Sequence, residues 1–236
     1  MPLMRSYGQF CPVAKAAEVF CERWTALIIR ELIGPPRRFS ELQRGVPLMS
    51  PSMLSRRLRQ LEAEGVIRRE GPPGRGGTYR LTEAGAEFAP IVEALGVWGQ
   101  RWTRRDLNED ELDLGLLVWS LEKSARADAF GNSRTVVYFE FSDQPVHKSA
   151  WWFVNADGRC QLCIDDPGWE VDLGVFCELP TIIRVIRGDI PLAAALNGPG
   201  LELAGPQALR RRFGAWLNLG PLTRITPMRD LRPQAG

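Results

Sequence analysis

Residues 50–65, SPSMLSRRLRQLEAEG, have the pattern of one amphipathic helix with clear start and stop signals. Ser50 is a good N-cap, and Pro51 suits the first helical position because no amide hydrogen is needed there. Gly65 is placed to end the helix in a left-handed conformation. Spacing of 3.6 residues puts three leucines on one narrow stripe, which we expect to be buried: Leu54, Leu58 and Leu61.

The other side of this helix carries small hydroxyls and arginines. Ser52, Arg56 and Arg59 lie opposite the leucines, and Ser55 and Arg57 lie on the flanks of that face. Such residues suit a helix that must approach base edges and phosphates closely, as in the major groove of DNA. An ordinary amphipathic helix with a solvated basic face has the same composition, so the flanking sequence has to decide.

The preceding residues predict further short helices. Helices are expected over residues 12–20 and 24–33, and the second must end at Gly34-Pro35-Pro36 because proline cannot continue the hydrogen-bond ladder. A third is expected to begin at Ser40, which forms a capping-box pattern with Gln43. Pro47 ends it before the turn that leads to Ser50. Two short helices joined by a tight turn, the second basic outside, are typical of a helix-turn-helix.

Residues 66–81 predict a β-hairpin directly after that helix. Two expected strands, 66–70 and 78–81, flank the loop GPPGRGG, with Arg75 near its tip. A hairpin in this place is the wing of a winged helix, and its arginine can reach an adjacent minor groove. A phosphate-binding glycine loop is disfavoured because no Lys-Ser/Thr pair follows and the loop joins two strands.

A long helix is expected from the Thr82 cap to about residue 105. It carries a broad apolar stripe: Phe88, Ile91, Val92, Leu95, Trp98 and Trp102. A small winged domain cannot cover that much apolar surface, so we expect this helix and the helix at 12–20 to pack against a second subunit. Docking on the C-terminal half of the same chain is the alternative.

Taken together, residues 10–102 resemble the HxlR family of winged-helix transcriptional regulators, relatives of the MarR group. The matching text is FCPVAKAAEVFCERWTALIIRELIGPPRRFSELQRGVPLMSPSMLSRRLRQLEAEGVIRRE followed by TYRLTEAGAEFAPIVEALGVWGQRW. The resemblance implies a homodimer on a pseudo-palindromic double-stranded DNA operator, with residues 51–64 in successive major grooves. On that basis we expect phosphate contacts from Arg38, Ser50 and Arg57 and a minor-groove contact from Arg75. Base contacts are expected from Ser52, Ser55, Arg56 and Arg59.

The net charge of +2 conceals two halves of opposite sign. Residues 1–105 hold 17 Lys and Arg against 10 Asp and Glu, a net charge of +7, whereas residues 106–236 hold 13 against 18, a net charge of −5. A basic first half suits a polyanionic partner. We therefore expect a DNA-binding and dimerisation domain over 1–106 and a second domain over 107–236. A cytoplasmic location is expected, with no membrane association, because no signal peptide or apolar span is evident.

The second half predicts an α+β domain. Helices are expected near 111–126, from Pro180 and over 206–218, and strands with period-2 alternation lie between them, including a hairpin that turns at 155–158. The expected fold is an antiparallel sheet covered by helices. The string IIRVIRGDIPLAAALNGPGLELAGPQALRRRF resembles the sterol carrier protein family, which implies an apolar tunnel for a hydrophobic effector. Its lining candidates, chosen by size alone, are Trp119, Trp151, Trp152, Phe153 and Trp169.

The sequence offers little to an enzyme and calls for no cofactor. His147 is the one histidine, so a histidine-based triad has nothing to draw on. A zinc site at Cys160-x-x-Cys163 lacks further ligands, and positions i and i+3 of a strand face opposite ways. Cys11 precedes a helix N-terminus, a place that favours a reactive thiolate, so it is either a redox sensor or a small buried residue at the dimer surface.

These patterns predict a sequence-specific, dimeric DNA-binding transcriptional regulator whose second domain binds a hydrophobic effector. The competing hypothesis is a carrier of lipids or other hydrophobic ligands in which the winged domain serves for dimerisation. Binding to the DNA upstream of its own gene distinguishes the two.

Overall fold

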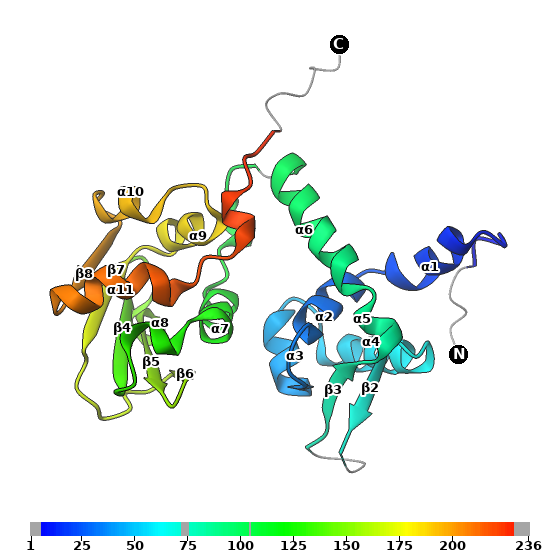
Figure 1. Cartoon of the computed structure of the whole chain (residues 1–236), viewed down its shortest axis with the longest axis horizontal. Helices are drawn as coiled ribbons and strands as arrows, with labels where there is room; N and C mark the ends of the chain where they lie inside the picture. Colours follow the sequence, from blue (N-terminus) through cyan, green and yellow to red (C-terminus); the bar gives the residue numbers. More distant parts are fainter. Residues whose placement is uncertain (1–5, 72–75, 104, 229–236) are drawn as a thin grey trace. The chain divides into compact units, whose positions relative to one another are not determined.

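The fold is seen in a computed structural model that describes residues 6–71, 76–103 and 105–228. The chain forms two compact units, Met1–Gly96 and Val97–Gly236 (Figure 1). The division lies between Gly96 and Val97, inside a helix, whereas the sequence placed the boundary after residue 106. Among the described residues there is no helix long and apolar enough to cross a membrane.

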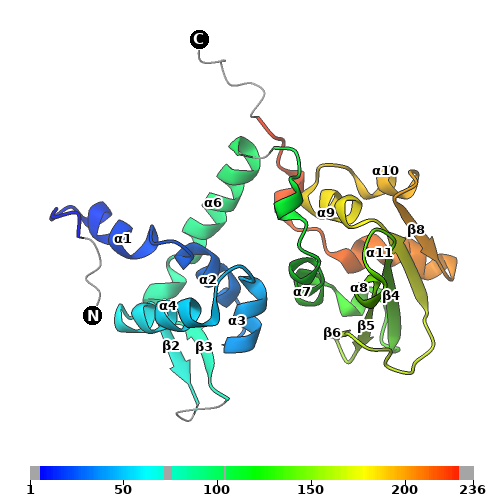
Figure 2. The same cartoon turned by 180° about the vertical axis from the view of Figure 1, so that it is seen from behind.

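The first unit is a winged helix-turn-helix (Figure 2). Its helices are α1 (Pro12–Phe20), α2 (Thr25–Leu32), α3 (Phe39–Gly45), α4 (Pro51–Ala63) and α5 (Glu83–Ala86), followed by α6 (Ala89–Trp102), which runs on into the second unit. Its strands are β1 (Arg37–Arg38), β2 (Ile67–Glu70) and β3 (Thr78–Leu81), in the order β1-β3-β2. All pairings are antiparallel, and β2 and β3 form the predicted wing.

Helix α4 begins and ends as its sequence predicts. The Ser50 hydroxyl accepts a hydrogen bond from the Met53 amide at 3.3 Å, and Pro51 occupies the first turn. Gly65 adopts φ +68°, a left-handed conformation that glycine takes without steric cost. The Val66 amide then reaches back to the Leu61 carbonyl at 2.9 Å, which satisfies one of the last carbonyls of the helix.

Two helix boundaries differ from the prediction. Helix α3 begins at Phe39, and its capping carboxylate is Glu41, which accepts a bond from the Arg38 amide at 2.7 Å. Gln43, the expected capping partner, donates to the Met49 carbonyl instead. The helix expected from Thr82 to residue 105 is broken into α5 and α6, because Pro90 has no amide hydrogen to continue the ladder.

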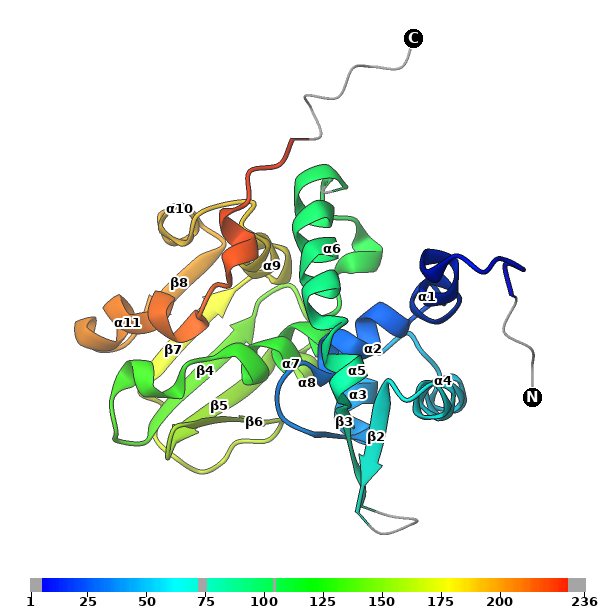
Figure 3. The same cartoon turned by 45° about the vertical axis from the view of Figure 1, so that its right-hand side comes forward.

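The second unit has one five-stranded sheet in the order β6-β5-β4-β7-β8 (Figure 3). Its strands are β4 (Thr135–Phe141), β5 (Ala150–Ala156), β6 (Arg159–Cys163), β7 (Leu173–Cys177) and β8 (Leu201–Ala204). The expectation of a purely antiparallel sheet is wrong, since β4 and β7 pair in parallel. Period-2 alternation shows which residues share a face but not the direction in which a strand re-enters the sheet.

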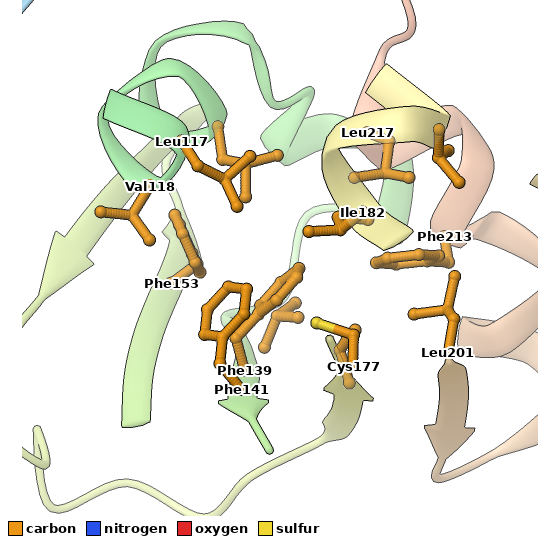
Figure 4. Packing of buried hydrophobic residues seen from close by; sticks show 14 of the residues in the cluster. Leu117, Val118, Phe139, Phe141, Phe153, Cys177, Ile182, Leu201, Phe213 and Leu217 are labelled. Carbon is orange, nitrogen blue, oxygen red and sulfur yellow. The ribbon is translucent and has the colours of Figure 1, made fainter. Parts of the chain in front are cut away.

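Helices cover one face of this sheet. They include α7 (Leu114–Ser124), α9 (Leu179–Arg187), the short α10 (Leu192–Leu196) and α11 (Gln207–Leu217), while the four-residue α8 (Val146–Ser149) links β4 to β5. In Figure 4, side chains from α7, α9 and α11 meet Phe139, Phe141 and Phe153 of the sheet. Trp216 lies in the same core, where its indole N–H donates to Asn155 at 2.7 Å. The face is therefore filled by closely packed aromatic rings.

Candidate DNA-binding surface

The leucine stripe fixes which side of α4 faces solvent. Leu54, Leu58 and Leu61 are buried in one cluster with residues of α2, α3 and β2. Because an α-helix places residues three and four apart on one face, burying these leucines leaves the opposite face open. The first unit therefore holds α4 with its polar face outward.

That outer face carries the expected serines and arginines. Ser52, Arg56 and Arg59 are exposed, and Ser55 is half-buried. The Arg59 guanidinium donates to the Ser55 hydroxyl at 2.9 Å, one helical turn away. One of its five N–H groups is used in this way, so a donor pair remains for a planar acceptor such as a guanine edge.

Arg57 lies in a different environment from the one expected. Its guanidinium contacts the Glu22 carboxylate at 2.8 Å, and the Arg57 side chain is only 13% exposed. This ion pair joins α4 to the segment between α1 and α2. Arg57 thus holds the helix in place in the DNA-free chain, and its expected phosphate contact stays a prediction.

A notch of about 460 Å³ lies at the base of the wing. Arg38, Arg69 and Tyr79 line it together with Ser40 and the last glycines of the wing loop. Arg38 and Ser50, both expected to contact phosphate, are exposed. Ser50 lies at the start of α4. Arg69 was not singled out from the sequence, because only the β-hairpin brings it beside Arg38. The sequence did hold one signal for it: β2 contains two successive arginines, Arg68 and Arg69, and alternation along a strand puts them on opposite faces.

The wing strands carry a cluster of charged side chains. The Glu70 carboxylate accepts from Arg68 at 3.1 Å and from Arg80 at 3.3 Å. Two arginines around one carboxylate leave this cluster with a net positive charge. Arg75, the expected minor-groove contact, lies outside the described residues.

The remaining candidates do not gather into one site. Cys11 is a half-buried free thiol at the N-cap of α1. The aromatic ligand candidates of the second unit are dispersed: Trp119 is buried on α7, Phe153 is buried in the core, Trp151 packs against that core, Trp152 contacts Tyr138, and Trp169 lies under Arg134 at 3.4 Å. Trp152 and Phe153 are adjacent on β5 and point to opposite faces of the sheet.

The CxxC segment lies on β6. Cys160 packs against the core, and Cys163 is on the opposite face. Burial, with Glu122 and Cys163 adding to it, raises the pKa of Cys160 to about 12. The pKa of Cys163 is also raised, mainly by burial. Both groups are therefore neutral thiols near pH 7, and among the described residues no cluster of three metal-ligating side chains is found.

Comparison with known proteins identifies the first unit. Residues 19–107 match the family model described as HxlR-like helix-turn-helix. An uncharacterized HTH-type transcriptional regulator of Bacillus subtilis, YvaP, is 37% identical over 98 residues, which are 40% of this chain and 91% of that protein. The HTH-type transcriptional regulator YodB of the same organism is 30% identical over 95 residues, 39% of this chain and 85% of its own length.

Solved structures that match this chain include the redox regulator HypR in its oxidized form. It is 33% identical, with a TM-score of 0.37, and the match covers 41% of this chain and 100% of that one. YvaP and YodB are both named as HTH-type regulators of transcription. The chain belongs to the HxlR-like helix-turn-helix family and is a DNA-binding regulator of transcription.

Proposed function

We propose that this regulator binds a two-fold symmetric operator as a homodimer, with α4 of each copy in the major groove. The observation that carries this proposal is the exposed row of Ser52, Arg56 and Arg59 above a fully buried leucine stripe. Ser55, which orients Arg59, belongs to the same base-reading row. Phosphate contacts come from Arg38 and Ser50, and the minor-groove contact expected of Arg75 belongs to the same proposal.

The test is an electrophoretic mobility shift with the DNA upstream of the regulator's own gene, at two salt concentrations. Arg56→Ala or Arg59→Ala is expected to weaken specific binding by about 1–3 kcal/mol if the residue reads a guanine. Arg184→Ala, at an exposed arginine of the second unit, removes the same charge and is the matched control. Undiminished discrimination between operator and random DNA in both α4 variants would exclude their base-reading role.

The dimer rests on apolar side chains that the described first unit does not cover. Val13 of α1 is 76% exposed, and Ile91 and Leu95 of α6 are each 46% exposed. Large exposed apolar side chains grouped on helices mark association surfaces. Leu95→Glu is expected to shift the protein from dimer to monomer in light scattering, whereas Glu93→Gln, on the same helix, is expected to leave the dimer intact.

The second unit is proposed to bind a hydrophobic effector. A groove of about 950 Å³ lies between α10, β8 and α11. Its apolar lining comes from Leu192, Leu196, Leu201 and Leu203. Mass spectrometry of compounds extracted from freshly purified protein tests this role. A bound ligand that changes operator affinity supports an effector, whereas a ligand without such an effect supports a carrier.

Two roles for Cys11 are separated by alkylation. HypR is described as a redox regulator, and solved forms of YodB include a diamide-treated one and a quinone-bound one. We propose oxidant sensing as one role of Cys11, which is a free thiol at the N-cap of α1. This role requires that iodoacetamide labels Cys11 in the native protein, and an unlabelled Cys11 would exclude it. If Cys11 is protected in the dimer and labelled in the Leu95→Glu monomer, its role is packing at the subunit interface.

A further inference from the structure

The sheet of the second unit has one face that its helices leave uncovered. Alternate residues of the central strands point away from the core, and they bring Tyr138 of β4, Trp152 of β5 and Phe176 of β7 to this uncovered face. None of the three belongs to the core cluster of the described residues, and Phe176 is 38% exposed. Three aromatic side chains on neighbouring strands therefore lie together on a face that the core does not use.

The three rings form a continuous group. The centroids of Tyr138 and Trp152 are 5.3 Å apart, and those of Tyr138 and Phe176 are 6.3 Å apart in an edge-on arrangement. Gly174 makes this possible, because a Cβ at that position would lie 2.9 Å from the Phe176 ring. The Phe176 ring therefore lies across Gly174, toward Tyr138.

Carboxylates lie in the adjoining row of the same face. Strand register places Glu140 of β4 on one side of Phe176 and Glu202 of β8 on the other. Together with Glu178, these side chains line a small pocket of about 200 Å³ next to the ring of Phe176. Within the described part of the chain no basic side chain forms an ion pair with any of the three carboxylates.

We propose that this face binds a small organic ammonium ion, seated against Phe176 and Tyr138 and held between Glu140 and Glu202. Aromatic faces attract cations through the negative potential above the ring, and ammonium groups are recognised in this way by grouped aromatic side chains. The carboxylates add the opposite charge, and the net charge of −5 over residues 106–236 has the same sign. The same charge disfavours an anionic ligand.

The hydroxyl of Tyr138 contributes to the same arrangement. It donates to the Glu140 carboxylate at 2.9 Å. Burial, together with this hydrogen bond and the charge of Glu140, raises the pKa of Tyr138 to about 12. The phenol is thus a neutral donor that fixes the direction of the Glu140 carboxylate beside the rings. The site adjoins the leucine-lined groove, with which it shares Glu202 at the edge of β8. It does not depend on the DNA contacts.

The experiment uses benzyltrimethylammonium as the probe and the full, DNA-free chain. Calorimetric titration measures affinity, and NMR of the ¹⁵N-labelled protein follows the Trp152 indole and the amides of β7. Benzyl alcohol is the neutral comparison and benzenesulfonate the anionic one. We expect saturable binding of the cation alone, with shifts concentrated on Trp152, Tyr138 and Phe176.

Variants assign the binding to these side chains. Phe176→Leu is expected to weaken binding roughly 3- to 30-fold, the range of a cation–π contact. The double variant Glu140→Gln/Glu202→Gln keeps hydrogen-bonding oxygens and is expected to weaken binding by about fivefold or more. Glu170→Gln, an exposed glutamate ahead of β7, is the matched control and should bind as the parent does.

Three results would overturn the proposal. The first is equal binding of benzyl alcohol and the cation, which would show a merely apolar patch. The second is no NMR shift at Trp152 or Phe176 at any soluble concentration of the cation. The third is an unchanged affinity for the cation in the folded Phe176→Leu and Glu140→Gln/Glu202→Gln proteins. Folding of each variant is verified by the dispersion of its NMR spectrum.

Discussion

Replacing Gly85 by alanine tests how the recognition helix and the wing are held together. Gly85 lies in α5, where an added Cβ would be 1.9 Å from the Val66 carbonyl oxygen. The obstacle is backbone, not a flexible side chain, so α5 has to move away from the junction of α4 and β2. That junction also holds Thr82, whose amide donates to the same Val66 carbonyl at 3.1 Å.

The expected cost follows from these contacts. Forcing a methyl group into a closely packed site costs about 1–3 kcal/mol. Loss of the hydrogen bond between Thr82 and Val66 adds about 1 kcal/mol. For a unit of this size, a loss of about 2–4 kcal/mol corresponds to a fall in melting temperature of about 10–25 °C.

Scanning calorimetry of the full chain measures this loss, and hydrogen exchange of the α4 amides assigns it to the first unit. Gly99→Ala is the matched control, because its Cβ would meet only the Thr103 hydroxyl at 3.6 Å, an ordinary contact. Alanine in a helix is favoured over glycine, so the control should be equally or more stable than the parent. A Gly85→Ala protein as stable as the parent, with unchanged α4 protection, would refute the reasoning.

Three further outcomes are expected. Glu22→Gln removes the partner of Arg57 and should cost about 0.5–1 kcal/mol of stability in urea unfolding while leaving operator discrimination intact; lost discrimination would show that Arg57 contacts DNA. Asn155→Leu leaves the buried indole N–H of Trp216 without its acceptor and should cost the second unit about 1–3 kcal/mol by calorimetry, and a neutral effect would contradict this. Because burial raises the folded pKa of Cys160 to about 12 from 9.0, its contribution to stability should be full below pH 9 and be lost as pH rises toward 12. Alkaline unfolding followed by circular dichroism should therefore be less steep over this range in Cys160→Ala than in the parent, and equal slopes would contradict this.

Several features of the fold could be predicted because neighbours in sequence determine them. The start of α4 depends on Ser50 and Pro51, its end on Gly65, and its buried stripe on the spacing of the leucines. The hairpin turn at Asp157 and Gly158 has positive φ at both residues, as its sequence indicates. The polyanionic partner could likewise be predicted, because the excess of basic residues in the first half depends on composition alone.

The tertiary structure alone decided the features that join distant residues. Arg57 and Glu22 are 35 positions apart, so no local pattern could show that this arginine is engaged within the protein. The parallel pairing of β4 with β7 and the placing of Phe176 between Glu140 and Glu202 depend on strand order and register. Periodicity along a chain reports which face of an element is buried. It carries no information about which element lies beside it, because that choice is made by packing across the whole unit.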